Sequence, residues 1–137
     1  MLLQTQQKST VLQKIVDLLY DGFEKYSWVG IYLVKGDSLI LGPWKGTQAT
    51  EHTSIPLGKG VCGAAVQSGK TECVDDVSKD ARYLSCFLST RSEIVVPIKK
   101  ASGILGEIDI DSDRPAAFDA QDVEFLEKVA DMLSVHI

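Results

Sequence analysis

The segment formed by residues 104–112 constrains the fold most strongly, because apolar and acidic side chains alternate along it. Successive side chains of a β-strand point to opposite faces of a sheet. One face of this segment would carry Ile104, Ile108 and Ile110, and the other Leu105, Glu107, Asp109 and Asp111. The pattern predicts a strand whose apolar face packs on a core, while its acidic face is either solvated or gathered around a polar site.

Two further patterns predict β-hairpins. Apolar, β-branched and aromatic residues dominate residues 28–34, and a Lys-Gly-Asp turn leads into a second apolar run at 38–42. The acidic strand has a similar partner at residues 94–98, across a polar turn. Pro97 has no N–H to donate to a ladder, so we expect an open edge or a bulge there. Residues 71–74 form a short strand candidate between the hairpins.

Apolar residues at three- and four-residue steps predict an amphipathic helix near each end of the chain. Ser9 or Thr10 can cap the first helix, and Asp119 can cap the last. Small residues at 61–67, followed by Gly69, predict a short helix between the hairpins. The apolar stripes consist of Val11, Leu12, Ile15, Leu18, Leu19 and Phe23 in the first helix, and of Val123, Leu126, Val129, Ala130 and Leu133 in the last.

The predicted order of elements is helix, two strands, short helix, three strands, helix. The hairpins indicate an α+β fold with a mainly antiparallel central sheet, and we expect the N- and C-terminal helices to pack together on one face of it. A chain of 137 residues, of which 45% are hydrophobic, is large enough to bury its own core. We therefore expect a single domain over residues 1–137.

Charge and composition exclude several kinds of partner and site. The formal net charge of −5, without a basic stripe, disfavours nucleic acid. No window approaches the roughly 18 apolar residues of a membrane span, and the N-terminus lacks the apolar core of a signal peptide, so we expect a cytoplasmic protein without membrane contact. The three cysteines include no Cys-x-x-Cys pair, and the two histidines lack convergent ligands, so the sequence predicts no metal site and no cofactor.

A thiol and a carboxylate stand at the junction between a polar loop and a strand. Cys86 lies in the loop, and Glu93 lies at the start of the apolar run. This pair is compatible with chemistry and also with chance. Cys62 would lie in the first turn of the short helix, where backbone N–H groups and the helix dipole favour a thiolate, although burial would act in the opposite direction. Cys73 is expected to be a small core residue.

Five motifs, taken in order along the chain, carry a resemblance to a known family. They are WVGIY at 28–32, GPW at 42–44, IPLGKGVCG at 55–63, Cys86 with SEIVVP at 92–97, and GEIDIDS at 106–112. The series resembles that of the free methionine-R-sulfoxide reductases, which are small stand-alone GAF-domain enzymes. The resemblance covers residues 28–135 and implies a single GAF-like domain.

By this resemblance, Cys86 is the nucleophile in the reduction of free L-methionine-R-sulfoxide to methionine. A thiolate attacks the sulfur while the departing oxygen is protonated, which leaves a cysteine sulfenic acid. Two ways of clearing the sulfenic acid are open. Either Cys62 resolves Cys86 through an internal disulfide that thioredoxin reduces, or an external thiol such as thioredoxin reduces Cys86 directly. The first is favoured.

The resemblance also implies which residues bind the substrate. Glu93, Asp109 and Asp111 are candidates for a carboxylate cluster that holds the ammonium group of a free amino acid. Because neighbouring carboxylates raise each other's pKa values, the cluster could also supply a protonated acid, with Glu93 as the catalytic candidate. Strand alternation puts Trp28 and Tyr32 on one side, where they are either core aromatics or an apolar wall for the methyl-thio group, with Tyr32 donating a hydrogen bond.

The chain departs from the family pattern in the loop before IPLGKGVCG. Many of these enzymes have a resolving cysteine there, whereas residues 47–54 contain none, and His52 or Thr50 stands near its place. The absent cysteine leaves open a reductase that binds methionine sulfoxide without turnover. The fold itself leaves open a non-catalytic GAF-type sensory module for a small ligand, because one scaffold hosts many kinds of site. The expected partners are free methionine-R-sulfoxide and thioredoxin or another thiol reductant, and a homodimer is left open.

Overall fold

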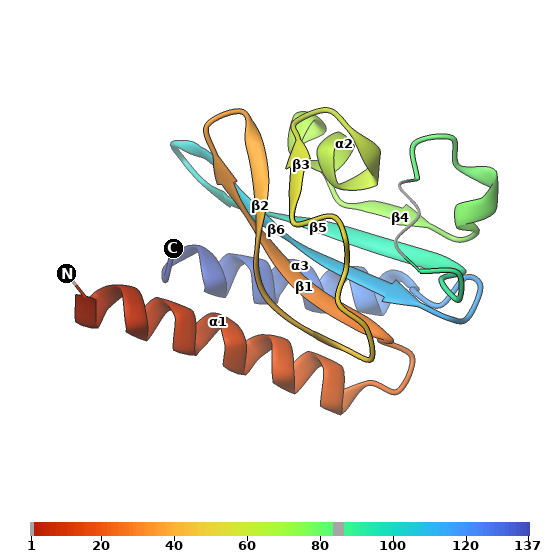
Figure 1. Ribbon diagram of the computed structural model, residues 1–137, viewed down its shortest axis with the longest axis horizontal. Helices are drawn as coiled ribbons and strands as arrows, with labels where there is room; N and C mark the ends of the chain where they lie inside the picture. The colour runs from red at the N-terminus through yellow and green to blue at the C-terminus, as the bar shows by residue number, and fades with distance from the viewer. Residues whose placement is uncertain (1, 84–86) are drawn as a thin grey trace.

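The structure is a computed structural model that describes residues 2–83 and 87–137, with side chains from residue 9 onward. Its elements are α1 (Leu2–Gly22), β1 (Trp28–Lys35), β2 (Ser38–Gly46), β3 (Ser54–Pro56), α2 (Gly60–Ser68), β4 (Glu72–Val74), the 3-10 helix η1 (Val77–Lys79), β5 (Ser92–Lys100), β6 (Gly103–Ser112) and α3 (Ala120–Ser134). Within the described residues, six strands form one sheet in the order β3-β2-β1-β6-β5-β4, and all neighbouring pairs are antiparallel. Helices α1 and α3 lie on one face of the sheet, and α2 lies on the other (Figure 1). The predicted α+β fold is confirmed.

The pairing register around β6 brings distant parts of the sequence onto one face of the sheet. Trp28 and Tyr32 of β1 lie opposite Asp111 and Glu107 of β6. On the other side of β6, Glu93 of β5 also lies opposite Asp111. Residues directly opposite each other in antiparallel strands share a face. These five side chains therefore all point away from the layer formed by α1 and α3.

The face toward α1 and α3 carries the main apolar core. Ile108 and Ile110 of β6 are 1% and 0% exposed, and they belong to one cluster with Leu12 and Val16 of α1 and Leu126 of α3. Full burial of such a side chain contributes roughly 1.5–3 kcal/mol. This layer stabilises the scaffold, which leaves the opposite face of the sheet available for polar residues.

Helix α1 begins before its predicted cap. The helix already includes Leu2, so Ser9 and Thr10 lie inside it and the predicted cap is wrong. The residues that precede them include leucine, glutamine and lysine, which are good helix formers, so the helix continues toward the N-terminus. One residue of the predicted stripe also differs, because Leu18 is 59% exposed while Val16 faces the core.

Strand β3 is missing from the predicted order. It has only three residues and pairs with the first residues of β2. A segment this short shows no strand period, so pairing rather than local pattern defines it. Other predicted boundaries are confirmed. Helix α2 ends at Gly69, which has a left-handed φ of 69°, and Pro97 lies on β5 beyond the stretch paired with β4.

Asp122 connects the start of α3 to the segment that leads into β1. Its carboxylate accepts hydrogen bonds from Tyr26 Oη and from Lys25 Nζ, each at 2.6 Å. It also accepts one from the backbone N–H of Asp119 at 2.9 Å. The Asp119 side chain in turn accepts from the N–H of Asp122, which makes a capping box and confirms Asp119 as the predicted cap. We call Lys25, Tyr26, Asp119 and Asp122 the Asp122 cluster.

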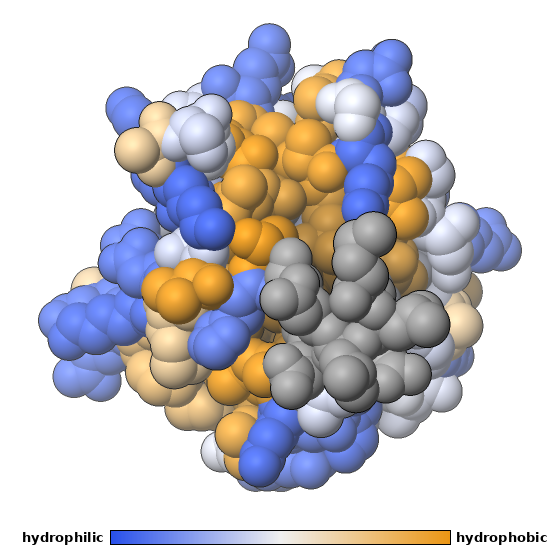
Figure 2. Space-filling view, turned by 90° about the vertical axis from the view of Figure 1, so that its left-hand side faces the viewer, coloured by the Kyte–Doolittle hydropathy of each residue, from blue (hydrophilic) through white to orange (hydrophobic). Residues whose placement is uncertain are grey.

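Figure 2 shows the side of the molecule that faces left in Figure 1. Apolar side chains gather in the middle of this face, and hydrophilic side chains border them on more than one side. No helix in the described part of the chain combines the length and the apolar character that crossing a membrane requires. The helices instead bury one apolar stripe each against the sheet.

Candidate active site

The acidic face of the sheet is buried. Glu93, Glu107, Asp109 and Asp111 are only 5%, 0%, 4% and 2% exposed. Helix α2 packs against both β5 and β6, on the side of the sheet away from α1 and α3 (Figure 1). A solvated strand face is therefore the wrong interpretation. We call these four residues the carboxylate cluster.

Burial raises the pKa of every carboxyl in this cluster. For Glu93 the charges on Asp109 and Asp111 add to the effect of burial. For Asp109 hydrogen bonds with Glu93 and Cys62 act in the opposite direction, but the pKa is still raised. Among the described residues, no lysine or arginine forms an ion pair with any of the four carboxyl groups. The cluster therefore favours retained protons or a bound cation.

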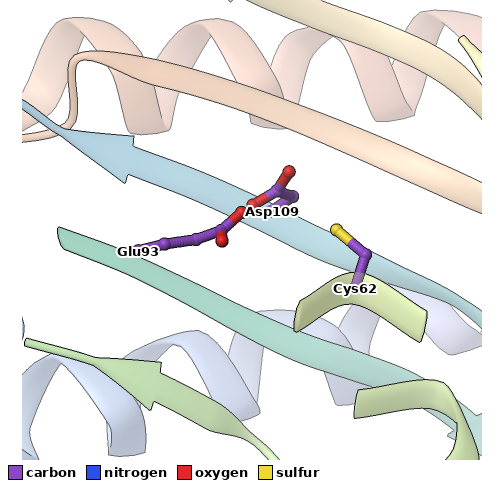
Figure 3. A group of neighbouring side chains, drawn as sticks. All are labelled: Cys62, Glu93 and Asp109. Atoms are coloured by element: carbon purple, nitrogen blue, oxygen red, sulfur yellow. The ribbon is translucent and has the colours of Figure 1, made fainter. Parts of the chain in front are cut away.

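Cys62 faces the carboxylate cluster from the first turn of α2. Its Sγ and one oxygen each from Glu93 and Asp109 all lie within 4.8 Å of one another (Figure 3). Burial, followed by the charges on Asp109, Glu107 and Glu93, raises the pKa of this thiol well above its ordinary value. Burial and negative charge thus outweigh the helix N-terminus, and Cys62 is held as a thiol.

Glu107 is part of this environment, although the sequence did not single it out as a site residue. Both of its carboxylate oxygens are buried, without a hydrogen-bond partner of ordinary geometry among the described residues. Burial raises the pKa of Glu107, while the nearby Cys62 thiol acts to lower it. The sequence feature that could have identified Glu107 is its spacing of two residues from Asp109, which places both side chains on the same face of the strand.

Trp28 lies at the centre of an aromatic group on the same face. Its ring stacks on that of Trp44 with centroids 6.2 Å apart, and meets Phe87 at 6.0 Å in a tilted arrangement. Gly30 and Gly46 make room for the indole, because a Cβ at either position would overlap the ring. Trp44 and Phe87 were not predicted as site residues. Trp44 belongs to the GPW motif at residues 42–44, and this motif is the sequence feature that could have identified it.

A cavity of about 210 Å³ opens beside this aromatic group. Trp28, Phe87, Thr90 and Asp111 are among its lining residues, and we call it the outer cavity. Thr90 Oγ1 donates a hydrogen bond of 3.3 Å to Asp111 Oδ2. Asp111 Oδ1 has no such partner in the described part of the chain. A carboxylate oxygen with spare acceptor capacity therefore lies at the wall of an aromatic cavity.

The other predicted residues surround a much smaller inner cavity of about 10 Å³. This space holds roughly one water molecule. The Tyr32 hydroxyl donates a 2.7 Å hydrogen bond to the carbonyl of His52, so its proton is engaged with the loop that precedes β3. The lining of the inner cavity comprises Tyr32, His52, Ile55, Gly60, Val61, Cys62, Glu93 and Asp109.

The two remaining cysteines are Cys86 and Cys73. Cys86, the predicted nucleophile, lies outside the described residues, although its neighbour Phe87 lines the outer cavity. Cys73 is exposed on β4, so its predicted place in the core is wrong. Its Sγ lies 3.8 Å from the carbonyl oxygen of Phe118, and Cys73 lines neither cavity.

Comparison with known proteins establishes the family. The GAF domain family matches residues 8–137. The free methionine-R-sulfoxide reductase of Escherichia coli (strain K12) is 35% identical over 116 residues, which cover 85% of this chain and 69% of that protein. This chain belongs to the free methionine-R-sulfoxide reductase family of GAF domains.

Solved structures agree with membership of the free methionine-R-sulfoxide reductase family. The type II free methionine-R-sulfoxide reductase from Thermoplasma acidophilum superimposes with a TM-score of 0.94 at 37% identity, covering 97% of this chain and 94% of that chain. The enzyme from Neisseria meningitidis, solved in complex with its substrate, gives a TM-score of 0.88 at 37% identity, covering 94% and 77%. The family and the enzyme class inferred from the sequence motifs are confirmed.

Proposed function

We propose that this chain reduces free methionine-R-sulfoxide to methionine, with the outer cavity as its substrate site. The observation that carries the proposal is the buried carboxylate cluster, which reaches an aromatic cavity of about 210 Å³ through Asp111. Pockets for drug-sized ligands measure about 300–1,000 Å³. The smaller outer cavity suits a ligand of amino-acid size.

Recognition of a free amino acid follows from the charge of the lining. A free amino acid carries an ammonium group, which methionine within a peptide lacks. Asp111 Oδ1, which has no hydrogen-bond partner among residues 9–83 and 87–137, can accept a charge-assisted hydrogen bond from that group. Trp28 and Phe87 form an apolar wall for the methyl-thio group. Trp28 Nε1 is also buried without a partner in the described part of the chain, so it can donate to an oxygen of the substrate.

Cys86 is the proposed nucleophile. Its sulfur attacks the sulfoxide sulfur, the S–O bond of the substrate breaks, and the oxygen remains on Cys86 as a sulfenic acid while methionine leaves. The thiol loses two electrons and the substrate gains them. The departing oxygen needs a proton during this step. Glu93 is the proposed donor, because burial and the charges on Asp109 and Asp111 raise its pKa.

Cys62 is the proposed resolving thiol. It attacks the sulfenic sulfur of Cys86, a disulfide forms and water leaves. A thioredoxin-type dithiol then reduces the disulfide. Because the pKa of Cys62 is raised, little of it is thiolate near neutral pH, so we expect resolution to be slower than substrate reduction. The disulfide also requires the two Cα atoms to approach within roughly 7 Å.

Turnover of separate R and S forms of free methionine sulfoxide, with dithiothreitol as reductant, tests the activity. We expect the wild-type protein to consume the R form and Cys86→Ser to consume neither. Cys73→Ser is the matched control, because it removes an exposed thiol that lines neither cavity, and it should retain wild-type turnover. If the wild-type protein binds the R form but consumes neither, a sensory or degenerate module replaces the reductase.

Thioredoxin-coupled turnover tests the resolving step separately. Cys62→Ser should convert one equivalent of substrate and then turn over more slowly than Cys73→Ser. Mass spectrometry of wild-type protein after substrate addition without reductant should find Cys62 joined to Cys86. Unchanged steady-state turnover by Cys62→Ser would exclude this role and indicate direct reduction by an external thiol.

A further inference from the structure

We propose that Cys62, Glu93 and Asp109 bind a single divalent cation of the zinc class, and that the bound cation inhibits substrate reduction. One sulfur and two carboxylate oxygens, brought together from α2, β5 and β6, form the donor set (Figure 3). The inhibition rests on the proposed function. The binding itself does not, so the two can be tested apart.

The donor atoms are already close to a coordination geometry. They lie within 4.8 Å of one another. Zinc bonds to cysteine sulfur at about 2.3 Å and to carboxylate oxygen at about 2.0–2.2 Å, so tetrahedral ligands lie about 3.6 Å apart. Because the widest separation is no more than 4.8 Å, it has to close by roughly 1.2 Å at most. The terminal torsions of Glu93 and Asp109 have broad energy wells, so small rotations of the two carboxylates bring their oxygens closer to the sulfur.

Asp109 and Glu107 of the carboxylate cluster have buried oxygens that accept no hydrogen bond from the described part of the chain. Asp109 Oδ1 is buried without a hydrogen-bond partner in the described part of the chain, and the residue is only 4% exposed. Glu107, which is 0% exposed and adjoins Cys62, has two such oxygens. Buried polar atoms normally have a partner, and buried charges are normally paired or coordinate a metal. A cation beside Asp109 supplies that partner.

The available space and the donor types select the class of cation. The inner cavity that Cys62, Glu93 and Asp109 line measures about 10 Å³, which admits a single ion and no organic ligand. A thiolate disfavours magnesium and calcium, which prefer oxygen ligands, whereas zinc accepts sulfur, nitrogen and carboxylate oxygen. His52 lines the same cavity. Binding displaces the proton of the Cys62 thiol and any proton held by the two ligating carboxyl groups, and these protons pass to solvent.

Inhibition follows from the roles proposed for these residues. A cation on Glu93 removes the proposed proton donor, and its positive charge opposes the ammonium of the substrate beside Asp111. Coordination also occupies the Cys62 sulfur, which then cannot attack the sulfenic acid. The linear spacing of cysteines and histidines does not indicate this site, because its donors come from three separate elements.

Cobalt spectroscopy tests the binding without any enzymatic turnover. Reduced, metal-free protein is titrated with Co²⁺ alone and then with Zn²⁺ as competitor. We expect one equivalent of Co²⁺ to give a thiolate-to-cobalt charge-transfer band that Zn²⁺ abolishes. Cys62→Ser should lack the band. Asp109→Asn should weaken binding by about a hundredfold or more, since even residues that only support metal ligands contribute about 10–100-fold.

Two controls show which thiol carries the metal. Cys73→Ser and Cys86→Ser should both keep the cobalt band with one equivalent bound. Absence of the band in wild-type protein, or its persistence in Cys62→Ser, would overturn the proposed site. Loss of the band in Cys86→Ser alone would move the site to another thiol and also overturn it. Circular dichroism establishes that each variant is folded, and Asp109→Asn decides the question if Cys62→Ser does not fold.

A single-turnover experiment tests the inhibition without thiol reductants, which would chelate zinc. Metal-free and zinc-loaded protein each receive one equivalent of free methionine-R-sulfoxide, and methionine is quantified over time. We expect one equivalent of Zn²⁺ to slow methionine formation at least tenfold, as expected for loss of about 1.4 kcal/mol or more, and excess EDTA to restore it. Unchanged rates would overturn the inhibition. If metal-free protein forms no methionine, the proposed function fails, while the cobalt spectra still decide the binding.

Discussion

Replacing Asp122 with alanine should destabilise the protein by about 2–5 kcal/mol at pH 7. The carboxylate accepts 2.6 Å hydrogen bonds from Tyr26 Oη and Lys25 Nζ, and one of 2.9 Å from the Asp119 backbone. Tyr26 is 1% exposed, so leaving its hydroxyl unpaired costs about 1–3 kcal/mol. Loss of the capping interaction adds about 1 kcal/mol. The ion pair adds at most about 1 kcal/mol, because Lys25 is partly solvated.

The effect should depend on pH in a defined direction. Burial acts to raise the pKa of Asp122, but hydrogen bonds from Lys25, Tyr26 and Asp119 outweigh it and lower the pKa below its ordinary value. The stabilisation is therefore fully present above the unfolded pKa of about 3.9 and is lost as pH falls through the lower folded value. The difference between wild-type and Asp122→Ala proteins should shrink accordingly below about pH 4.

Urea unfolding followed by far-UV circular dichroism measures this difference. With a slope of about 2 kcal/mol per molar urea, in the middle of the usual range, the midpoint should fall by about 1–2.5 M. Asp131→Ala is a matched control, because Asp131 lies on the exposed face of the same helix, and it should change stability by no more than about 0.5 kcal/mol. A loss no larger than that of the control would refute the proposed role of the Asp122 cluster.

Three further substitutions test the site. Gly30→Ala should displace the Trp28 indole and raise KM for free methionine-R-sulfoxide. Gly22→Ala is the control, because its added methyl group meets open space. Equal KM values for the two variants would contradict a role for the Trp28 position in substrate binding. Asp111→Asn should raise KM about 10–100-fold, because a charge-assisted hydrogen bond contributes about 1.5–3 kcal/mol; an unchanged KM would place the ammonium elsewhere. Burial raises the pKa of Glu107, so as pH rises this carboxyl group ionises in the unfolded chain before it ionises in the folded protein. The free energy of unfolding should therefore fall by up to about 1.4 kcal/mol per pH unit above about pH 4.3. Glu107→Gln should therefore become more stable relative to wild type as pH rises from 5 to 8. Urea unfolding with a chelator present measures the difference, and parallel pH profiles of the two proteins would contradict the raised pKa of Glu107.

Local periodicity accounts for what could be predicted from the sequence. The alternation along β6 correctly assigned Ile108 and Ile110 to the core and Asp109 and Asp111 to the opposite face, because the period of a strand is a property of the backbone. Asp119 was predictable because capping involves only the next few residues.

Contacts between distant segments account for what could not be predicted. The same alternation left open whether the acids are solvated, since that depends on α2 covering them from outside the strand. Glu107 acquires its significance only when Cys62 of α2 packs against it, and β3 exists only because β2 offers it an edge. The aromatic group likewise depends on the antiparallel pairing that places Trp44 beside Trp28.

The stacking of Trp28 on Trp44 has a practical consequence. These are the only two tryptophans of the chain, and their rings lie 6.2 Å apart at the aromatic group beside the outer cavity. Excitation of indole therefore samples one small region of the protein, without background from elsewhere. Because Trp28 lines the outer cavity, we expect its fluorescence to change when a ligand occupies that cavity, so stopped-flow measurement of ligand entry and product release needs no attached dye.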